Sequence, residues 1–339
     1  VCWEPQNRHF FFFSDDRHSV VILSTNQEFA LVYNPDSNKP TFKQEADRNY
    51  YLLDLKKDIK TPFLTQQSST SGKLYFSPSG KFIVYFKECN WWIYSIETGI
   101  HTNMTLKTNV SFYDNSNDEP DEPNPYGYAG FTANDEFVLL YDEFDLWQFK
   151  TTGESAKKIT SGRENDQVLR LVDTDKGNIN HIASKGKMID IYSDLIFKVQ
   201  TINNDKSGYF ILDKNKKLRS IIYKPKLISS LYKANAINSF IYVQEDFNEP
   251  PTLFIKNGNT QPKIIYKSSP QHNDYGWGKS QLITYKNTNG IHLKGVLFYP
   301  FDYNPQQKYP MLVSIYQKQT KALHSYVNPS LLNGSAFNV

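Results

Sequence analysis

Residues Tyr75–Thr105 read YFSPSGKFIVYFKECNWWIYSIETGIHTNMT, and residues Gly130–Thr160 read GFTANDEFVLLYDEFDLWQFKTTGESAKKIT. The two stretches align without a gap. In each, a small polar turn precedes an apolar run, Phe82–Phe86 or Phe137–Tyr141, and a charged turn then leads to a strand-like aromatic segment. Polar turns between such runs predict antiparallel strands joined by hairpins.

Partial copies of this pattern occur elsewhere in the chain. Asn49–Asp58 matches Asn90–Gly99, and both Ser207–Lys214 and Thr252–Gly258 repeat the aromatic strand and its turn. A unit of this size cannot bury its apolar faces alone, so such units are expected to stack around an axis as blades. The repeats therefore predict a mainly β fold containing a β-propeller, with a β-sandwich as the alternative.

The composition agrees with a sheet protein. The 339 residues include 23 Tyr, 23 Phe and 5 Trp, and aromatic side chains suit the pleated surface of a sheet. A net charge of +3 gives no general reason to expect a nucleic-acid partner. One short basic cluster is interpreted as a solvated hairpin tip, with a nucleic-acid patch as the alternative: Lys214, Lys216, Lys217 and Arg219. No run of 18 apolar residues exists, so no membrane span is expected.

An acidic loop is predicted between the two best repeats. Residues 117–125 read NDEPDEPNP, and three prolines with four carboxylates do not fit a sheet interior. We predict a substrate-access loop whose carboxylates are Asp118, Glu119, Asp121 and Glu122. Ordinary solvated loop charge and a glycosidase-type acid/base pair are the alternatives.

Familiar catalytic motifs are absent from the sequence. It holds no GxSxG nucleophile elbow, no P-loop, no GxGxxG after a strand and no HExxH. The two cysteines, Cys2 and Cys89, form neither a disulfide framework nor a zinc motif. Seven histidines are scattered without metal spacing: His9, His18, His101, His181, His272, His292 and His324. No metal and no cofactor are expected.

The character of the sequence changes near Asp274. Two alternating segments, Gln281–Lys286 and His292–Tyr299, predict strands, and Met311–Tyr316 is a continuous apolar run. Such a run suits a strand covered on both faces, as in α/β proteins. We therefore predict a propeller over residues 1–273, with an incomplete propeller at the N-terminal end as an alternative. Residues 274–339 are predicted to form the first strands of an α/β domain. Residues 317–339 contain no completed element, as expected of part of a longer domain.

The region after Asp274 resembles the junction between propeller and α/β-hydrolase domain in the prolyl oligopeptidase family of serine peptidases, which includes dipeptidyl peptidase IV and acylaminoacyl peptidase. The pattern is Gly290-x-x-Leu293-x-Gly295-x-Leu297-x-x-Pro300 followed by Lys308-Tyr309-Pro310-Met311-Leu312-Val313. The resemblance implies an α/β-hydrolase peptidase domain whose catalytic Ser, Asp and His lie beyond this chain. The chain alone is then expected to be inactive.

The resemblance also implies a site residue and partners. Tyr316 matches the tyrosine whose hydroxyl helps to bind the oxyanion, a role that suits a phenol at the end of a strand. The implied partner is a peptide substrate admitted through the propeller, and a homodimer through the hydrolase domain is allowed. A secreted or periplasmic protein is favoured, although no signal peptide is present in this chain. The rival hypothesis is a non-enzymatic propeller that binds a protein or glycan.

Overall fold

The computed structural model describes residues 2–4, 9–11, 20–43, 45–70, 72–116, 121–172, 188–315 and 319–329. The chain divides into two compact units. Unit 1 contains residues 1–161 and 182–191, and unit 2 contains residues 162–181 and 192–339. The domain boundary expected between residues 273 and 274 remains a prediction.

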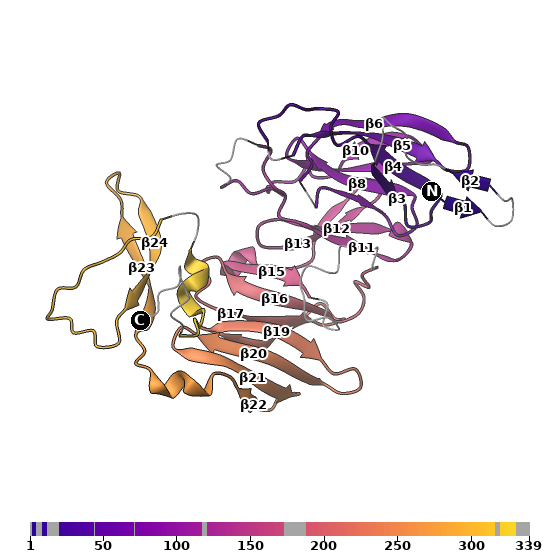
Figure 1. Ribbon diagram of the computed structural model, residues 1–339. Helices are drawn as coiled ribbons and strands as arrows, with labels where there is room; N and C mark the ends of the chain where they lie inside the picture. The colour runs from indigo at the N-terminus through magenta and orange to yellow at the C-terminus, as the bar shows by residue number, and fades with distance from the viewer. Residues whose placement is uncertain are drawn as a thin grey trace. The chain divides into compact units, whose positions relative to one another are not determined.

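Unit 1 contains three four-stranded antiparallel sheets in which the strands follow one another in sequence (Figure 1). The first is β3 (Val20–Leu23), β4 (Phe29–Tyr33), β5 (Arg48–Asp54) and β6 (Ile59–Gln67). The second is β7 (Leu74–Phe76), β8 (Phe82–Lys87), β9 (Asn90–Ser95) and β10 (Ile100–Asn103). The third is β11 (Tyr128–Phe131), β12 (Phe137–Tyr141), β13 (Leu146–Lys150) and β14 (Ala156–Lys158), with the 3₁₀ turn η1 (Ala133–Asp135). A short ladder pairs β1 (Cys2–Glu4) with β2 (His9–Phe11).

The repeated polar turns have a common hydrogen bond. At the first turn of each of these sheets, a hydroxyl oxygen accepts the backbone N–H of the phenylalanine five residues later. The pairs are Ser24 with Phe29 (3.0 Å), Ser77 with Phe82 (3.1 Å) and Thr132 with Phe137 (2.9 Å). The hydroxyl satisfies a backbone donor that would otherwise be left unpaired where the strand begins. This contact explains why STNQEF, SPSGKF and TANDEF recur in the sequence.

Successive sheets of unit 1 pack face to face. Strand β8 lies in the middle of this arrangement, and side chains alternate between the two faces of a strand. Ile83 and Tyr85 join the apolar cluster with the first sheet, whereas Val84 and Phe86 join the cluster with the third. Both faces of β8 are therefore buried, which explains its continuous apolar run.

Unit 2 repeats the blade arrangement twice. One sheet is β15 (Gln167–Leu171), β16 (Leu195–Thr201), β17 (Ser207–Leu212) and β18 (Leu218–Lys224). The other is β19 (Leu227–Lys233), β20 (Ser239–Asp246), β21 (Glu249–Asn257) and β22 (Lys263–Lys267). A two-stranded sheet follows, β23 (Lys279–Lys286) and β24 (His292–Tyr299). The described 3₁₀ turns of this unit are η2 (Arg163–Asn165), η5 (Pro270–Asp274) and η6 (Thr320–His324).

The two larger sheets of unit 2 share one apolar cluster. Ile196 and Tyr209 of the first sheet pack with Ile228, Leu231 and Tyr242 of the second. Stacked four-stranded meanders are the blades of a propeller, so the mainly β, propeller-type fold predicted from the repeats is confirmed. The basic cluster near Lys214 lies at the β17–β18 hairpin tip, as predicted, where Arg219 pairs with Asp213 at 3.6 Å.

The C-terminal predictions have mixed outcomes. Strand β24 has the predicted limits, and β23 begins two residues before its predicted start. The prediction of a strand over Met311–Tyr316 is wrong for residues 311–315, because these residues are not in a strand. Leu312 is 86% exposed and Ile315 85% exposed. A strand buried on both faces needs neighbouring strands and covering helices, and no described residue supplies a strand partner here.

Among the described residues, no helix is long and apolar enough to cross a membrane.

Candidate functional site

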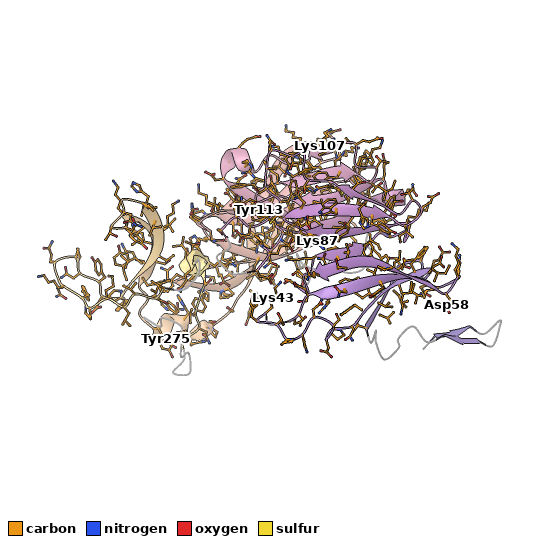
Figure 2. The ribbon with its side chains drawn as sticks, turned by 90° about the horizontal axis from the view of Figure 1, so that it is seen from above. Lys43, Asp58, Lys87, Lys107, Tyr113 and Tyr275 are labelled. Atoms are coloured by element: carbon orange, nitrogen blue, oxygen red, sulfur yellow. The ribbon has the colours of Figure 1, made fainter. Side chains whose placement is uncertain are left out.

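Unit 1 has an open pocket of about 280 Å³ surrounded by charged side chains. Its residues come from the β4–β5 loop, the end of β6, the β8–β9 turn and the acidic loop before β11. They are Lys43, Asp47, Gln66, Ser68, Lys87, Glu88, Asp121 and Glu122. Figure 2 shows Lys43 and Lys87 toward one end of the strands and Asp58 at the other. Loops that lie far apart in the sequence therefore meet at one place.

Lys43 joins the acidic loop to the first sheet. Its ammonium lies 2.8 Å from Asp47 and 2.9 Å from Asp121. Burial opposes the charge of Lys43, but hydrogen bonds to the two carboxylates outweigh burial and raise the pKa of its ammonium. Burial likewise opposes the charge of Asp121, but hydrogen bonds from Lys43 and from the Glu122 N–H lower the pKa of that carboxyl.

Lys73 forms the second connection, to two residues that line the pocket. It is only 2% exposed, and its Nζ lies 3.3 Å from Glu122 Oε2 and 3.2 Å from Ser68 Oγ. The ammonium also lies 5.7 Å from the centroid of the Phe86 ring, within range of a cation–π contact. A buried ammonium needs compensating contacts of this kind, because leaving water costs several kcal/mol.

Glu122 also supports a strained turn. Glu88 and Cys89, between β8 and β9, have φ angles of 53° and 59°, which residues other than glycine rarely adopt. The Cys89 N–H donates to Glu122 Oε1 at 3.2 Å. Burial and the charge of Glu122 raise the pKa of the Cys89 thiol, so the reactive thiolate is disfavoured at neutral pH.

The predicted site residues are only partly placed. Asp118, Glu119 and Tyr316 lie outside the described residues. Asp121 and Glu122 are brought together, half-buried, at the rim of the pocket, and each pairs with a lysine. Their role as a substrate-access loop stays a prediction.

Sequence reasoning missed the cations of this site. Lys43 and Lys73 lie in short polar stretches that read as ordinary exposed loops, and no local pattern distinguishes them. The prolines and carboxylates of residues 117–125 did indicate a loop. That this loop is ion-paired to two other segments depends on contacts between residues far apart in the chain.

A second polar cluster lies in unit 2, where residues 319–329 contact β20. Both ring nitrogens of His324 face acceptors: Asp246 Oδ1 at 2.8 Å and the Asp205 carbonyl at 3.0 Å. The Tyr326 N–H donates to Glu245 Oε1 at 3.2 Å, and the Tyr326 ring stacks on Trp277 at 4.9 Å. These contacts fasten the segment to the last large sheet of the unit.

Burial and hydrogen bonding set the charges of this cluster. Burial disfavours charge on His324, but hydrogen bonds to Asp246 and to the Asp205 carbonyl raise its pKa. Burial also disfavours charge on Asp246, but contacts with His324, the Phe247 N–H and Lys226 lower its pKa. Burial raises the pKa of the Glu245 carboxyl despite the Tyr326 N–H.

In the described part of the chain, no group of three or more His, Cys, Asp or Glu residues could hold a metal ion. The charges of both clusters are largely paired.

Comparison with known proteins gives a fold. No protein-family model and no curated protein sequence matches the chain. A solved structure from Bacteroides ovatus ATCC 8483, assigned as a dipeptidyl aminopeptidase IV, is 13% identical with a TM-score of 0.53 over 86% of this chain. The chain therefore shares its fold with the matched part of this dipeptidyl peptidase IV-like structure. The propeller part of the fold expected from the resemblance to the prolyl oligopeptidase family is thereby confirmed, and the α/β-hydrolase part stays a prediction.

Two further solved structures have lower TM-scores. Prolyl oligopeptidase B from Galerina marginata is 12% identical, with a TM-score of 0.43 over 81% of this chain. Dipeptidyl peptidase 4 from Porphyromonas gingivalis is 11% identical, with a TM-score of 0.32 over 91%. The chain spans 46%, 37% and 61% of the three proteins, in the order given.

Proposed function

We propose that this chain is the propeller and inter-domain portion of a serine peptidase that hydrolyses peptides. The observation that carries the proposal is the likeness in fold to the Bacteroides ovatus protein over 86% of this chain. The sequence pattern over residues 290–300 supports the proposal independently, because this pattern resembles the family's junction. The same residues contain the whole of strand β24.

The proposal divides the work between two domains. The catalytic Ser, Asp and His lie beyond this chain, in an α/β-hydrolase domain that begins near residue 274. Tyr316 supplies one hydrogen bond to the oxygen of the scissile carbonyl as negative charge develops there. The propeller limits access to short or unfolded peptides, because a folded protein cannot pass through a narrow opening.

Asp121 and Glu122 belong to the access route in this proposal. Their carboxylates are already paired with Lys43 and Lys73, so a cationic group of a peptide has to compete with these lysines. Such competition weakens general attraction of cations and favours a substrate that also offers a carboxylate or carbonyl to the displaced ammonium.

The test compares the full-length protein with residues 1–339, using a fluorophosphonate probe and chromogenic peptides. We expect the full-length protein to be labelled on a serine beyond residue 339 and to release the chromophore. Residues 1–339 alone should do neither, because they lack the nucleophile and its base.

Two outcomes would contradict the proposal. Labelling of a serine within residues 1–339 would place the nucleophile in the wrong domain. A folded full-length protein that is neither labelled nor active would favour the rival function, a propeller that binds a protein or glycan.

A further inference from the structure

Strand β22 leaves an apolar sheet edge exposed in unit 2. It is the last strand of its sheet, and among the described strands it pairs only with β21 (Figure 1). Its sequence is KIIYK, and its three central side chains are exposed: Ile264 by 52%, Ile265 by 51% and Tyr266 by 62%. Backbone N–H and C=O groups on the free side of an edge strand have no ladder partner, so this edge can accept one more strand.

The outer strands of the other described four-stranded sheets are less open to such pairing. Strand β6 contains Pro62, which has no N–H to donate, and β10 and β14 are only four and three residues long. Strand β18 buries Ile221 and Ile222. A register shift occurs in β6, β18 and β22 alike, so it does not distinguish them. Strand β22 has no proline and no buried residue, which makes it the most accessible of these five edges.

The charges around this edge favour an acidic partner. Lys263 and Lys267 lie at the two ends of the apolar run, and Lys256 lies in the neighbouring strand β21. Residues 250–273 contain these three lysines and no aspartate or glutamate. Glu249, which begins β21, is held in an ion pair with a lysine beside β19. An extended segment with a carboxylate near each end meets opposite charge at both ends of β22, and cross-strand pairs of opposite charge stabilise a sheet.

The same lysines oppose pairing between two copies of β22. In an antiparallel pair centred on Ile265, Lys263 of each copy lies opposite Lys267 of the other. In a parallel pair without offset, each lysine lies beside its own counterpart. Like charges directly opposite one another destabilise a sheet, so both arrangements are unfavourable. The edge therefore favours a different chain over a second copy of this one.

We propose that β22 is a docking edge for an extended segment of another protein, in which two carboxylate side chains flank three β-branched or apolar residues. The backbone of this segment continues the ladder of β22, and its central side chains cover Ile264, Ile265 and Tyr266. The two flanking carboxylates pair with Lys263 and Lys267. A uniformly charged polyanion offers nothing to the three apolar side chains, which is why a protein segment is the better match. The proposal is independent of the proposed peptidase activity.

Fluorescence anisotropy with labelled peptides and the 1–339 chain tests the docking edge. The probe is the end-blocked peptide Gly-Ser-Glu-Val-Thr-Val-Glu-Ser-Gly, and the matched peptide has lysine in place of both glutamates. We expect the glutamate peptide to bind at least about tenfold more tightly, with a preference that falls as salt rises. Methylating the backbone nitrogens of one alternate set of its residues should abolish binding, and methylating the other set should not, because only one set faces β22. Equal binding of the two peptides, or equal effects of the two methylated sets, would overturn the proposal.

Variants assign the binding to β22. Lys263→Gln combined with Lys267→Gln should weaken binding of the glutamate peptide by roughly fivefold to tenfold. The control combines Lys214→Gln with Lys217→Gln, which removes the same charge from exposed positions at the β17–β18 tip and should keep the full affinity. Arginine at both positions 263 and 267 keeps the charge and should bind like the wild type. Equal weakening in the two glutamine variants, or lost binding in a folded arginine variant, would contradict the assignment.

Two other occupants of the edge have distinct signatures. A dimer of the 1–339 chain that the glutamate peptide dissociates, detected by sedimentation, would assign β22 to a second copy and overturn the proposal. Displacement of the peptide by heparin, with heparin bound equally well after Ile265→Ser, would assign the lysines to a polyanion instead. We expect a monomer, and we expect Ile265→Ser to weaken binding of the glutamate peptide, because the apolar contact is part of the proposed interface.

Discussion

Two tyrosines in one apolar cluster differ in a single hydrogen bond. Tyr209 and Tyr242 both lie between the large sheets of unit 2, and burial raises the pKa of each phenol to about 12. The hydroxyl of Tyr209 is bonded to the Leu231 backbone. The hydroxyl of Tyr242 is buried and has no hydrogen-bond partner among the described residues. The same side chain is therefore stabilising in one position and costly in the other.

Replacing each tyrosine by phenylalanine separates these effects. Tyr209→Phe should lower the free energy of unfolding by about 1 kcal/mol, because it leaves a buried backbone group unpaired. Tyr242→Phe should leave it unchanged or raise it by up to about 1 kcal/mol, because an unsatisfied hydroxyl disappears. Urea unfolding followed by tryptophan fluorescence measures both. A clear loss of stability in Tyr242→Phe would show that its hydroxyl has a partner in solution.

Removing either charge of the Lys73–Glu122 ion pair should lower stability, but by different amounts. Glu122→Gln keeps the size of the side chain but leaves the buried ammonium of Lys73 uncompensated, so we expect a loss of roughly 2–3 kcal/mol in unfolding free energy. Lys73→Met removes the buried charge itself and should cost less. Chemical denaturation measures both variants and their double mutant.

The exposed pair Lys150–Glu154, separated by 3.6 Å, provides the matched control. Glu154→Gln should change stability by less than about 0.5 kcal/mol, as is usual for exposed ion pairs. If Glu122→Gln costs no more than Glu154→Gln, the acidic loop is not held by Lys73.

Strands whose limits depend on nearby residues could be predicted from the sequence, and strands that depend on distant neighbours could not. Strands β12 and β24 have the predicted limits because polar turns on both sides define them. The hydroxyl contacts at Ser77 and Thr132 span only five residues, so a repeat can reveal them. The prediction of a strand from Met311 was wrong for the opposite reason. A buried strand depends on neighbours, and an apolar run does not tell whether those neighbours are in the chain.

The attachment of residues 319–329 to β20 should depend on pH. Because both ring nitrogens of His324 face acceptors, both contacts need the doubly protonated ring. Because the pKa of His324 is raised in the folded protein, its contribution to the stability of the attachment is complete below its ordinary pKa of 6.5. That contribution is lost as the pH rises through the pKa of His324 in the folded protein. Because the pKa of Asp246 is lowered in the folded protein, its contribution to the stability of the attachment is present above its ordinary pKa of 3.8. That contribution is lost as the pH falls through the pKa of Asp246 in the folded protein. The attachment is therefore strongest between these limits.

Hydrogen exchange at the Tyr326 amide measures this attachment, after correction for the intrinsic rate at each pH. Protection should be greatest between the ordinary pKa values of Asp246 and His324, 3.8 and 6.5, and should fall as the pH rises through the raised pKa of His324. His324→Gln should flatten the profile, whereas His292→Gln, at an exposed position of β24, should not. Lys226, Asp205 and Glu245 also lie in this cluster, and a profile unchanged in His324→Gln would assign the pH dependence to them.

At the scale of the whole molecule, the fold was predictable and the site only in part. Repeats reveal an architecture because each blade carries its own copy of the signal. The pocket depends on single contacts between segments, such as Lys73 with Glu122, 49 residues apart. A lone lysine in a polar stretch carries no sign that it will be buried.

In the proposed function, the Tyr316 hydroxyl contacts the oxyanion of the full-length protein. Tyr316 lies outside the described residues, and its role comes from the resemblance and from the proposed function. Tyr316→Phe should lower kcat by on the order of 100-fold, about 3 kcal/mol, with little change in KM, because the hydroxyl acts on charge that exists only in the transition state. Phenylalanine keeps the ring and its packing, so the change isolates the hydroxyl. Tyr303→Phe, at an exposed position after β24, is the control and should leave both constants unchanged. An unchanged kcat in a folded Tyr316→Phe enzyme would reduce Tyr316 to a structural residue, and a rise in KM alone would assign its hydroxyl to substrate binding.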